Sequence, residues 1–243
     1  MKIITVAMQK GGTGKTTTAA ALAQAAHLDG KKVLAVDLDP QSNLSYALAG
    51  KTGTPGSYEL ITDKDAPEPQ TTAQGIDLYA GSWDLSTITT GKGSARRLQT
   101  AIQPLKDKYD LIIIDTPPTA GEMLYNALQT STALIIPLTA DIYGLQALEQ
   151  ILDTARQIRQ SNPDLSVAGY IFTQYNPRAV LTKHMTEVFR GTAASAGVEY
   201  LGSVRQGIAI REAAALQQSL YEYAPKSNPA IDYQAIYQTI MSR

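Results

Sequence analysis

The stretch that decides the fold is Gln9–Thr16, with the sequence QKGGTGKT. It follows an apolar, β-branched run, Ile3–Met8, that predicts a strand, and it opens an alanine-rich stretch, Thr16–Leu28, that predicts a helix. Glycines between a strand and a helix let backbone N–H groups turn inward and approach an anion closely. The N-terminus of the following helix adds its partial positive charge. We therefore expect a loop that binds the phosphates of a nucleotide.

The polar side chains of this loop suit phosphate chemistry. Lys15 can neutralise β- and γ-phosphate oxygens, and the hydroxyl of Thr16 can bind Mg²⁺. The common motif has a glycine five residues before the Gly-Lys pair, whereas this chain has Gln9 there and an additional lysine, Lys10, beside two glycines. The residues of this segment expected to bind the nucleotide are Lys10, Gly11, Gly12, Thr13, Gly14, Lys15, Thr16 and Thr17.

Two further motifs place carboxylates at the ends of predicted strands. Asp37 and Asp39 follow one apolar run, and Asp115 ends another. Because ligands bind beyond the carboxyl ends of parallel strands, these carboxylates can face the same phosphate site. One of the first pair can orient a water or help to hold Mg²⁺, and Asp115 can hold Mg²⁺ directly or through water. The expected metal-binding residues are Thr16, Asp39 and Asp115.

Apolar β-branched runs alternate with helical stretches along the chain. Runs that are apolar at every position, such as Leu111–Ile114, are typical of strands covered on both faces, hence of a parallel sheet. The predicted strands are Ile3–Met8, Val33–Asp37, Ile76–Ala80, Leu111–Asp115, Ala133–Leu138, Val167–Phe172 and, more weakly, Glu199–Val204. The predicted helices are Thr16–Leu28, Leu145–Ile158, Arg178–Gly191, Ile208–Gln218 and Ile231–Met241. This order predicts a doubly wound α/β fold with a mostly parallel sheet flanked by helices.

The length of the chain suits one large domain, and we expect residues 1–243 to form it. Residues 50–75 carry Gly, Thr, Pro and Asp with little periodicity, so we expect a surface excursion with room for one short helix. The first strand-like run begins almost at Met1 and leaves no room for a secretory signal. No apolar run reaches the roughly 18 residues of a membrane span. These features predict a cytoplasmic protein.

Composition excludes several classes of site. The chain has no cysteine, so disulfides, thiolate metal sites and cysteine nucleophiles are excluded. His27 and His184 lie far apart and lack neighbours of the metal-ligand type, which favours ordinary surface or helix roles. The formal net charge is −1, so any nucleic-acid binding must come from a local basic patch and depend on salt.

Several segments resemble the ParA/MinD family of ATPases. The sequence of Lys10–Thr16 is similar to the family's deviant Walker A motif, KGGxGK[ST]. Asp37–Asn43, DLDPQSN, resembles ParA more than MinD, and Tyr109–Pro118, YDLIIIDTPP, resembles the Walker B strand followed by switch II. The similarity continues through Gly169–Tyr175 and Ser203–Ala213, and so covers nearly the whole chain.

The resemblance implies a P-loop NTPase fold of the deviant Walker A type, with ATP and Mg²⁺ as cofactors. It implies that Lys10 reaches across a homodimer interface to the partner's nucleotide, much as an arginine finger does. Asp39 is implied to activate the attacking water, while Asp37 is structural or assists the metal indirectly. Thr116–Pro118 would sense the γ-phosphate through its backbone. The expected catalytic residues are Lys10, Lys15 and Asp39.

The segment Ser203–Ala213 departs from the family pattern IPRNxxxxEA. Ser203-Val204 stands in place of Ile-Pro, and Gln206 stands in place of Asn. The resemblance implies that Val204 and Arg205 contact the nucleotide at this point.

The resemblance also implies that the ATP-bound dimer binds DNA non-specifically through basic residues of the C-terminal third. A ParB-like or other centromere-bound partner would stimulate slow hydrolysis. The best candidates for contacting DNA phosphates are Arg205, Arg211 and Lys226, followed by Lys183 and Arg190. The chain shows no N-terminal helix-turn-helix extension, so we do not expect operator binding.

Two alternatives stay open. A MinD-like positioning ATPase would act on a membrane, but the last predicted helix, Ile231–Met241, lacks the Lys and Arg that flank a membrane-surface helix. We therefore expect that helix to pack against the domain. A metabolic ligase or kinase of the same fold would show substrate-dependent turnover and little ATP-induced dimerisation.

Overall fold

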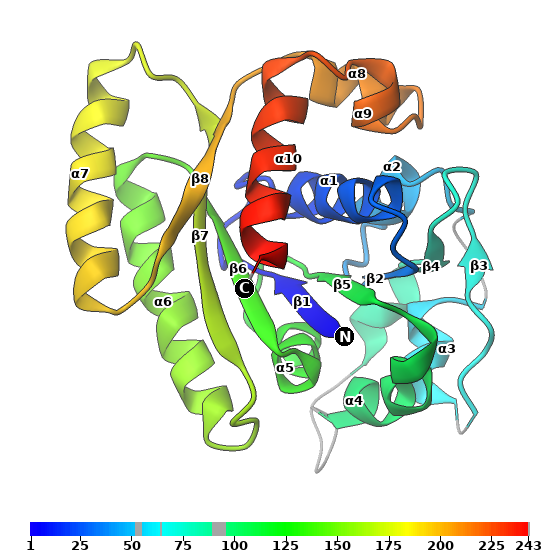
Figure 1. Cartoon of the computed structure of the whole chain (residues 1–243). Helices are drawn as coiled ribbons and strands as arrows, with labels where there is room; N and C mark the ends of the chain where they lie inside the picture. Colours follow the sequence, from blue (N-terminus) through cyan, green and yellow to red (C-terminus); the bar gives the residue numbers. More distant parts are fainter. Residues whose placement is uncertain (52–54, 64, 89–95, 243) are drawn as a thin grey trace.

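A computed structural model describes residues 1–51, 55–63, 65–88 and 96–242, and its strands form one eight-stranded sheet (Figure 1). The strand order is β3-β4-β2-β5-β1-β6-β7-β8, and only β3 runs antiparallel to its neighbour. The strands are β1 (Lys2–Val6), β2 (Val33–Asp37), β3 (Gln70–Thr71), β4 (Asp77–Tyr79), β5 (Leu111–Asp115), β6 (Ala133–Leu138), β7 (Ser166–Tyr175) and β8 (Tyr200–Arg205). The predicted doubly wound, mostly parallel α/β fold is confirmed.

Helices cover both faces of the sheet (Figure 1). One face packs against α1 (Lys15–Leu28), α2 (Asn43–Ala47), α8 (Ala209–Ala215), α9 (Leu220–Tyr223) and α10 (Asn228–Met241). The other packs against α3 (Ser57–Thr62), α4 (Arg97–Ile102), α5 (Glu122–Thr130), α6 (Ile142–Arg159) and α7 (Val180–Ser195). Short 3-10 helices follow β4 and α4, namely η1 (Trp83–Thr87) and η3 (Gln103–Lys108).

Strand β5 shows why its sequence is apolar at every position. Leu111 and Ile113 join the core cluster beneath α1 and α10, whereas Ile112 and Ile114 join the cluster beneath α3, α4 and α5. Successive side chains of a strand point to opposite faces, so a strand covered on both sides needs no polar position. All four residues are at most 1% exposed.

Residues 50–75 differ in part from the predicted surface excursion. The expected short helix is present as α3, and residues 52–54 and 64 lie outside the described residues. However, Leu60 and Ile61 of α3 are buried in the core, and β3 adds an edge strand to the sheet. The segment therefore contributes apolar side chains to the fold as well as covering its surface.

The last helix packs on the domain, as the sequence predicts. Tyr233, Ile236, Tyr237 and Ile240 of α10 are buried in the cluster shared with α1. Its apolar side is thus occupied by the protein's own core. None of the described helices is long and apolar enough to cross a membrane.

Candidate nucleotide site

The site lies at the carboxyl edge of the three central strands. Strand β5 lies between β1 and β2, and Asp115 is in register with Val6 of β1 and with Asp37 of β2. The loop after β1, the Asp37–Asp39 segment and Asp115 therefore meet at one edge of the sheet. This is where open α/β sheets bind ligands, and the three predicted motifs are brought together there.

The loop after β1 has the backbone geometry of an anion-binding turn. Gly12 and Gly14 have φ angles of 74° and 80°, which residues with a Cβ rarely adopt. Lys15 is buried, and its Nζ donates a hydrogen bond to the carbonyl oxygen of Lys10 at 3.0 Å. Burial lowers the pKa of Lys15, while the carboxylates of Asp115 and Asp39 oppose that shift. The lysine head group is therefore held inside the loop, close to two acidic side chains.

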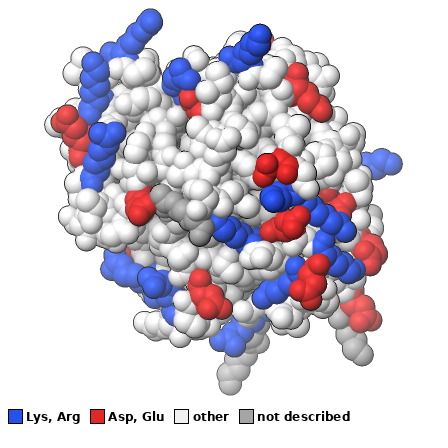
Figure 2. Space-filling model, in the orientation of Figure 1, with Lys and Arg blue, Asp and Glu red and all other residues white. Residues whose placement is uncertain are grey.

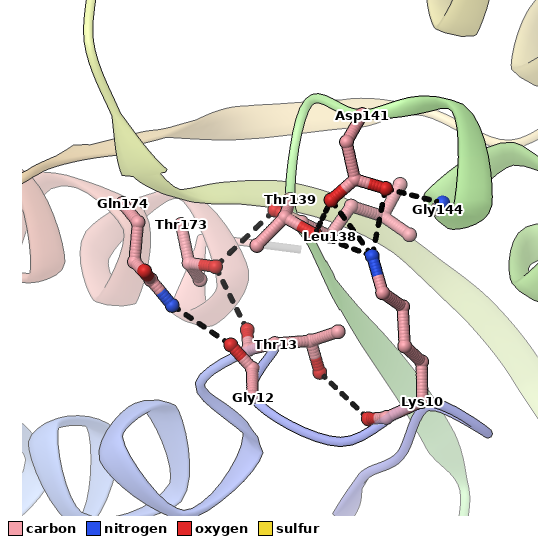
Figure 3. A network of polar contacts seen from close by, with 9 residues as sticks. All are labelled: Lys10, Gly12, Thr13, Leu138, Thr139, Asp141, Gly144, Thr173 and Gln174. Carbon is pink, nitrogen blue, oxygen red and sulfur yellow. Dashed lines mark hydrogen bonds and ion pairs between the residues drawn. The ribbon is translucent and has the colours of Figure 1, made fainter.

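Lys10 takes a different direction from Lys15. Its Nζ lies 2.7 Å from both carboxylate oxygens of Asp141 and 3.1 Å from the hydroxyl of Thr139, in the loop between β6 and α6 (Figure 3). Burial opposes ionisation of Asp141, but hydrogen bonds from Lys10, Thr139 and the Gly144 backbone lower its pKa. The two lysines of one loop thus have different partners, the Lys10 carbonyl oxygen for Lys15 and the Asp141 carboxylate for Lys10.

Asp115 is suited to a divalent cation. Its Oδ2 accepts a hydrogen bond from the hydroxyl of Thr16 at 2.6 Å, whereas its buried Oδ1 has no hydrogen-bond partner among the described residues. Burial and the neighbouring Asp37 raise the pKa of Asp115 well above its usual value, although Thr16 and Lys15 favour the carboxylate. A cation would satisfy the free oxygen and stabilise the ionised form.

Magnesium would need ligands from outside the protein at this site. Within the described part of the chain, no three His, Asp or Glu side chains form a group able to hold a metal ion. Mg²⁺ is commonly held by one or two carboxylates together with substrate phosphates and water. The pair of Thr16 and Asp115 fits that mode of binding, with nucleotide phosphates completing the shell.

Asp37 and Asp39 have distinct environments although they are two residues apart. Asp37 accepts hydrogen bonds from the backbone N–H and the hydroxyl of Ser45, at 2.9 and 2.7 Å, and from the N–H of Asp39 at 3.1 Å. Burial raises the pKa of Asp37 to about 6 despite these bonds. The carboxylate of Asp39 accepts a hydrogen bond from the N–H of Gln41 at 2.9 Å. Asp37 therefore fixes α2 and the Asp39 backbone, which agrees with the structural role implied for it.

A cavity of about 250 Å³ lies beside the loop, between the ends of β7 and β8 and α8. It is lined by predicted residues, namely Gly14, Thr17, Val204, Arg205 and Arg211, and also by Thr173, Gln174, Gln206, Gly207, Ile208, Ile210 and Tyr233. The guanidinium of Arg205 forms a two-fold hydrogen bond with Asp232 of α10, at 2.8 and 2.7 Å. A ligand of Arg205 would have to share it with that carboxylate.

Comparisons with known proteins agree with this geometry. Residues 1–167 match the family described as the AAA domain. The chromosome partitioning protein ParA of Myxococcus xanthus is 32% identical over 254 residues, covering 100% of this chain and 88% of that protein. The chromosome-partitioning ATPase Soj of Thermus thermophilus is 32% identical over 244 residues, covering 99% of this chain and 95% of that protein. The chain belongs to the ParA/Soj family of partitioning ATPases.

The fold of this ParA/Soj family ATPase also occurs in a biosynthetic enzyme. The structure of cobyrinic acid a,c-diamide synthase from Mycobacterium smegmatis, with bound ADP and magnesium, has a TM-score of 0.84 and 26% sequence identity. The match covers 98% of this chain and 92% of that one. The fold itself therefore does not separate partitioning from small-molecule chemistry, and that distinction depends on the sequence relationship.

Four basic candidates of the ParA-like C-terminal third lie on the surface, namely Lys183, Arg190, Arg211 and Lys226, whereas Arg205 is half-buried and bound to Asp232. Figure 2 shows Lys and Arg side chains along the edge formed by α7 and over α8. Arg211 on α8 and Lys226 before α10 are exposed and form no ion pair with another described residue. On α7, Arg190 stacks over the ring of Tyr200, with 5.2 Å between the guanidinium carbon and the ring centre. Arg211 and Lys226 are therefore free to meet an anionic partner.

Sequence reasoning missed the residues that hold this ParA-type loop from neighbouring elements. Thr173 and Gln174 of β7 contact the loop backbone, and Asp141 binds Lys10 (Figure 3). Asp141 had a local signal, because an aspartate just before a helical stretch is typical of an N-cap. Thr173 and Gln174 lay in a segment already noted for its resemblance, but no spacing indicated their contact with the loop.

Proposed function

We propose that this ParA/Soj family ATPase binds ATP with Mg²⁺, dimerises in that state and binds DNA non-specifically. A ParB-like, centromere-bound partner then stimulates hydrolysis and releases the dimer. The proposal depends on the different directions that the Lys10 and Lys15 side chains take. Lys15 is enclosed by its own loop, whereas Lys10 extends outward to Asp141 with a quarter of its side chain exposed. A lysine in that position is available to a nucleotide bound by a second copy.

The roles of the remaining residues follow from their positions. Lys15 neutralises phosphate oxygens, and Thr16 and Asp115 hold Mg²⁺, which withdraws charge from the phosphates when it is bound. Asp39, with one carboxylate oxygen engaged by Gln41, orients the attacking water. When Lys10 must come from a partner, turnover of the isolated chain is slow, because a charge supplied in trans can contribute roughly 10³–10⁵-fold in related phosphoryl transfer.

Surface features favour DNA over a membrane as the dimer's substrate. Arg211 and Lys226 are exposed cations, and dimerisation doubles any patch that they form. The C-terminal helix α10 is buried against α1 and β8, so it does not offer an apolar face to lipid. Both named relatives are chromosome-partitioning proteins. We place the ATP-bound protein on the nucleoid.

The test combines size-exclusion chromatography with co-sedimentation on DNA and on liposomes. The variant Asp39→Ala with ATP should elute as a dimer, hydrolyse nothing and be retained on DNA, while wild-type protein with ADP should elute as a monomer. ATP-dependent retention on liposomes with none on DNA would refute the DNA-bound state and support a MinD-like activity. Normal turnover by Asp39→Ala would refute its role toward water.

A further inference from the structure

The end of strand β7 holds the phosphate loop through two consecutive side chains. The hydroxyl of Thr173 donates a hydrogen bond to the carbonyl oxygen of Thr13 at 2.8 Å, and the side-chain amide of Gln174 donates to the carbonyl oxygen of Gly12 at 2.7 Å (Figure 3). The Thr173 hydroxyl also lies 3.2 Å from the carbonyl oxygen of Leu138, which links the pair to β6. Two adjacent peptide groups of the loop are thus fixed from one neighbouring strand.

Fixing a carbonyl also fixes the N–H group of the following residue. A trans peptide is planar, so its C=O and N–H bonds point in opposite directions. When Gln174 holds the Gly12 carbonyl on the outer side of the loop, the N–H of Thr13 must point inward. When Thr173 holds the Thr13 carbonyl, the N–H of Gly14 must point inward in the same way. These inward N–H groups are the donors that a phosphate would meet.

Gln174 adopts a strained backbone conformation to make this contact. Its φ angle is +50°, in the left-handed region that residues other than Gly, Asn and Asp rarely occupy. Such strain persists where the surrounding structure holds it, and it concentrates at functional sites. Thr173 also restricts the loop, because a Cβ added to Gly14 would lie 3.3 Å from its methyl carbon.

We propose that Thr173 and Gln174 are positioning residues that aim the N–H groups of Gly14 and Thr13 at the nucleotide phosphates. The inference rests on the proposed nucleotide site and assigns to β7 a role in phosphate affinity, although β7 belongs to no phosphate-binding motif. Both residues also line the adjacent cavity, so the same two side chains connect that cavity with the phosphate loop.

The test compares binding of ATP with binding of inorganic tripolyphosphate, which has phosphates but no base, to ligand-free full-length protein by calorimetry. Gln174→Gly removes the amide and suits the left-handed backbone, and Thr173→Val replaces the hydroxyl with a methyl group of similar size. Gln217→Gly is the matched control, because Gln217 has a φ angle of +54° and its amide donates to the carbonyl of Tyr46 at 3.3 Å, away from the loop.

We expect each β7 variant to weaken ATP and tripolyphosphate by the same factor, roughly three- to tenfold for each hydrogen bond removed. Gln174→Gly should melt no lower than wild type, since relief of strain offsets the missing bond, and Gln217→Gly should leave tripolyphosphate affinity unchanged. Unchanged tripolyphosphate affinity in both β7 variants would overturn the proposal, as would weaker binding of ATP alone, which would indicate a base contact.

The deciding readout, the affinity for tripolyphosphate, requires neither ATP-driven dimerisation nor DNA, so failure of those steps would leave its result intact. Wild-type protein that bound neither ligand would overturn the nucleotide site on which the inference rests.

Discussion

To contact a nucleotide bound by a second subunit, Lys10 must leave the Asp141 carboxylate and bind a phosphate instead. Its present partner, Asp141, also accepts a hydrogen bond from the Gly144 N–H at 2.8 Å and so caps α6. An asparagine keeps that cap but removes the negative charge. Since the ion pair is partly exposed, it is worth at most about 1 kcal/mol. A symmetric dimer releases two such pairs, so Asp141→Asn should strengthen the ATP-dependent dimer by up to roughly thirtyfold.

Analytical ultracentrifugation of wild type and Asp141→Asn at several ATP concentrations measures this change. An unchanged midpoint of unfolding would show that the cap is intact. If the Asp141→Asn dimer were instead weaker, the carboxylate would itself belong to the dimer contact. The idea that Asp141 competes with the partner's nucleotide for Lys10 would then be excluded.

Gly81 allows the Asp37–Asp39 segment to approach the end of β4. A Cβ at residue 81 would lie 2.7 Å from the Asp39 carbonyl oxygen and 3.0 Å from the Asp37 carboxyl carbon. Gly81→Ala must displace this segment, and we expect hydrolysis to fall more than about tenfold, with a loss of about 1–3 kcal/mol in unfolding free energy. Single-turnover kinetics and urea unfolding would measure both quantities.

Gly191 is the matched control for that substitution. It lies exposed within α7 with nothing within 4 Å of an added Cβ. Gly191→Ala should raise the unfolding free energy by about 0.5–1 kcal/mol and leave turnover unchanged. Equal turnover in Gly81→Ala and wild type would show that Asp39 needs no fixed backbone.

At the scale of elements, long strands and helices were predictable because their burial is regular. β2, β5 and β6 begin and end where the sequence predicted. Helix α5 was missed because Glu122, Asn126 and Gln129 are buried in it, which conceals its apolar side. Asn126 accepts a hydrogen bond from the Leu98 N–H, and Gln129 bonds to Ser161. No local pattern reveals these tertiary contacts.

The site likewise combines features that a local pattern reveals with contacts that only the tertiary structure creates. The meeting of the glycine-rich loop, Asp39 and Asp115 at one edge of the sheet was predictable, because each lies in a contiguous motif at a strand end. Asp141, Thr173 and Ser45 act only because β6, β7 and α2 lie next to the loop or to Asp37. Strand order determines those neighbours, and a single sequence does not contain it explicitly.

Helix α8 is the element expected to meet DNA. Arg211 projects from it without an intramolecular ion pair among the described residues. Arg211→Glu should weaken DNA binding by about tenfold or more and reduce the salt dependence by roughly one counterion for each DNA phosphate that the arginine neutralises. Because Arg211 also lines the cavity beside the phosphate loop, ATP affinity is measured separately and DNA binding is compared at saturating ATP. Fluorescence anisotropy on non-specific duplex DNA across a salt series measures affinity and slope together.

Arg159 provides the matched control on α6. It is exposed at the far end of that helix, near the amino edge of the sheet. Arg159→Glu makes the same change of charge without altering α8, so it should retain nearly wild-type affinity. An equal loss in both variants would show that net charge, rather than a patch on α8, governs binding.

For the whole molecule, mixing two inactive variants tests whether sites are shared between copies. A Lys10→Ala chain keeps its own Asp39 and Lys15, and an Asp39→Ala chain keeps a Lys10 to offer. If Lys10 acts in trans, a mixed dimer contains one complete site, on the Lys10→Ala chain. Random pairing makes half of the dimers mixed, so the mixture should recover about one quarter of wild-type ATPase activity.

Mixing Lys10→Ala with the double variant Lys10→Ala/Asp39→Ala should recover none, because neither chain then offers the lysine. If the first mixture also stayed inactive while dimers formed, Lys10 would act on its own chain's nucleotide. The contact between Lys10 and Asp141 would then belong to the nucleotide-free state alone.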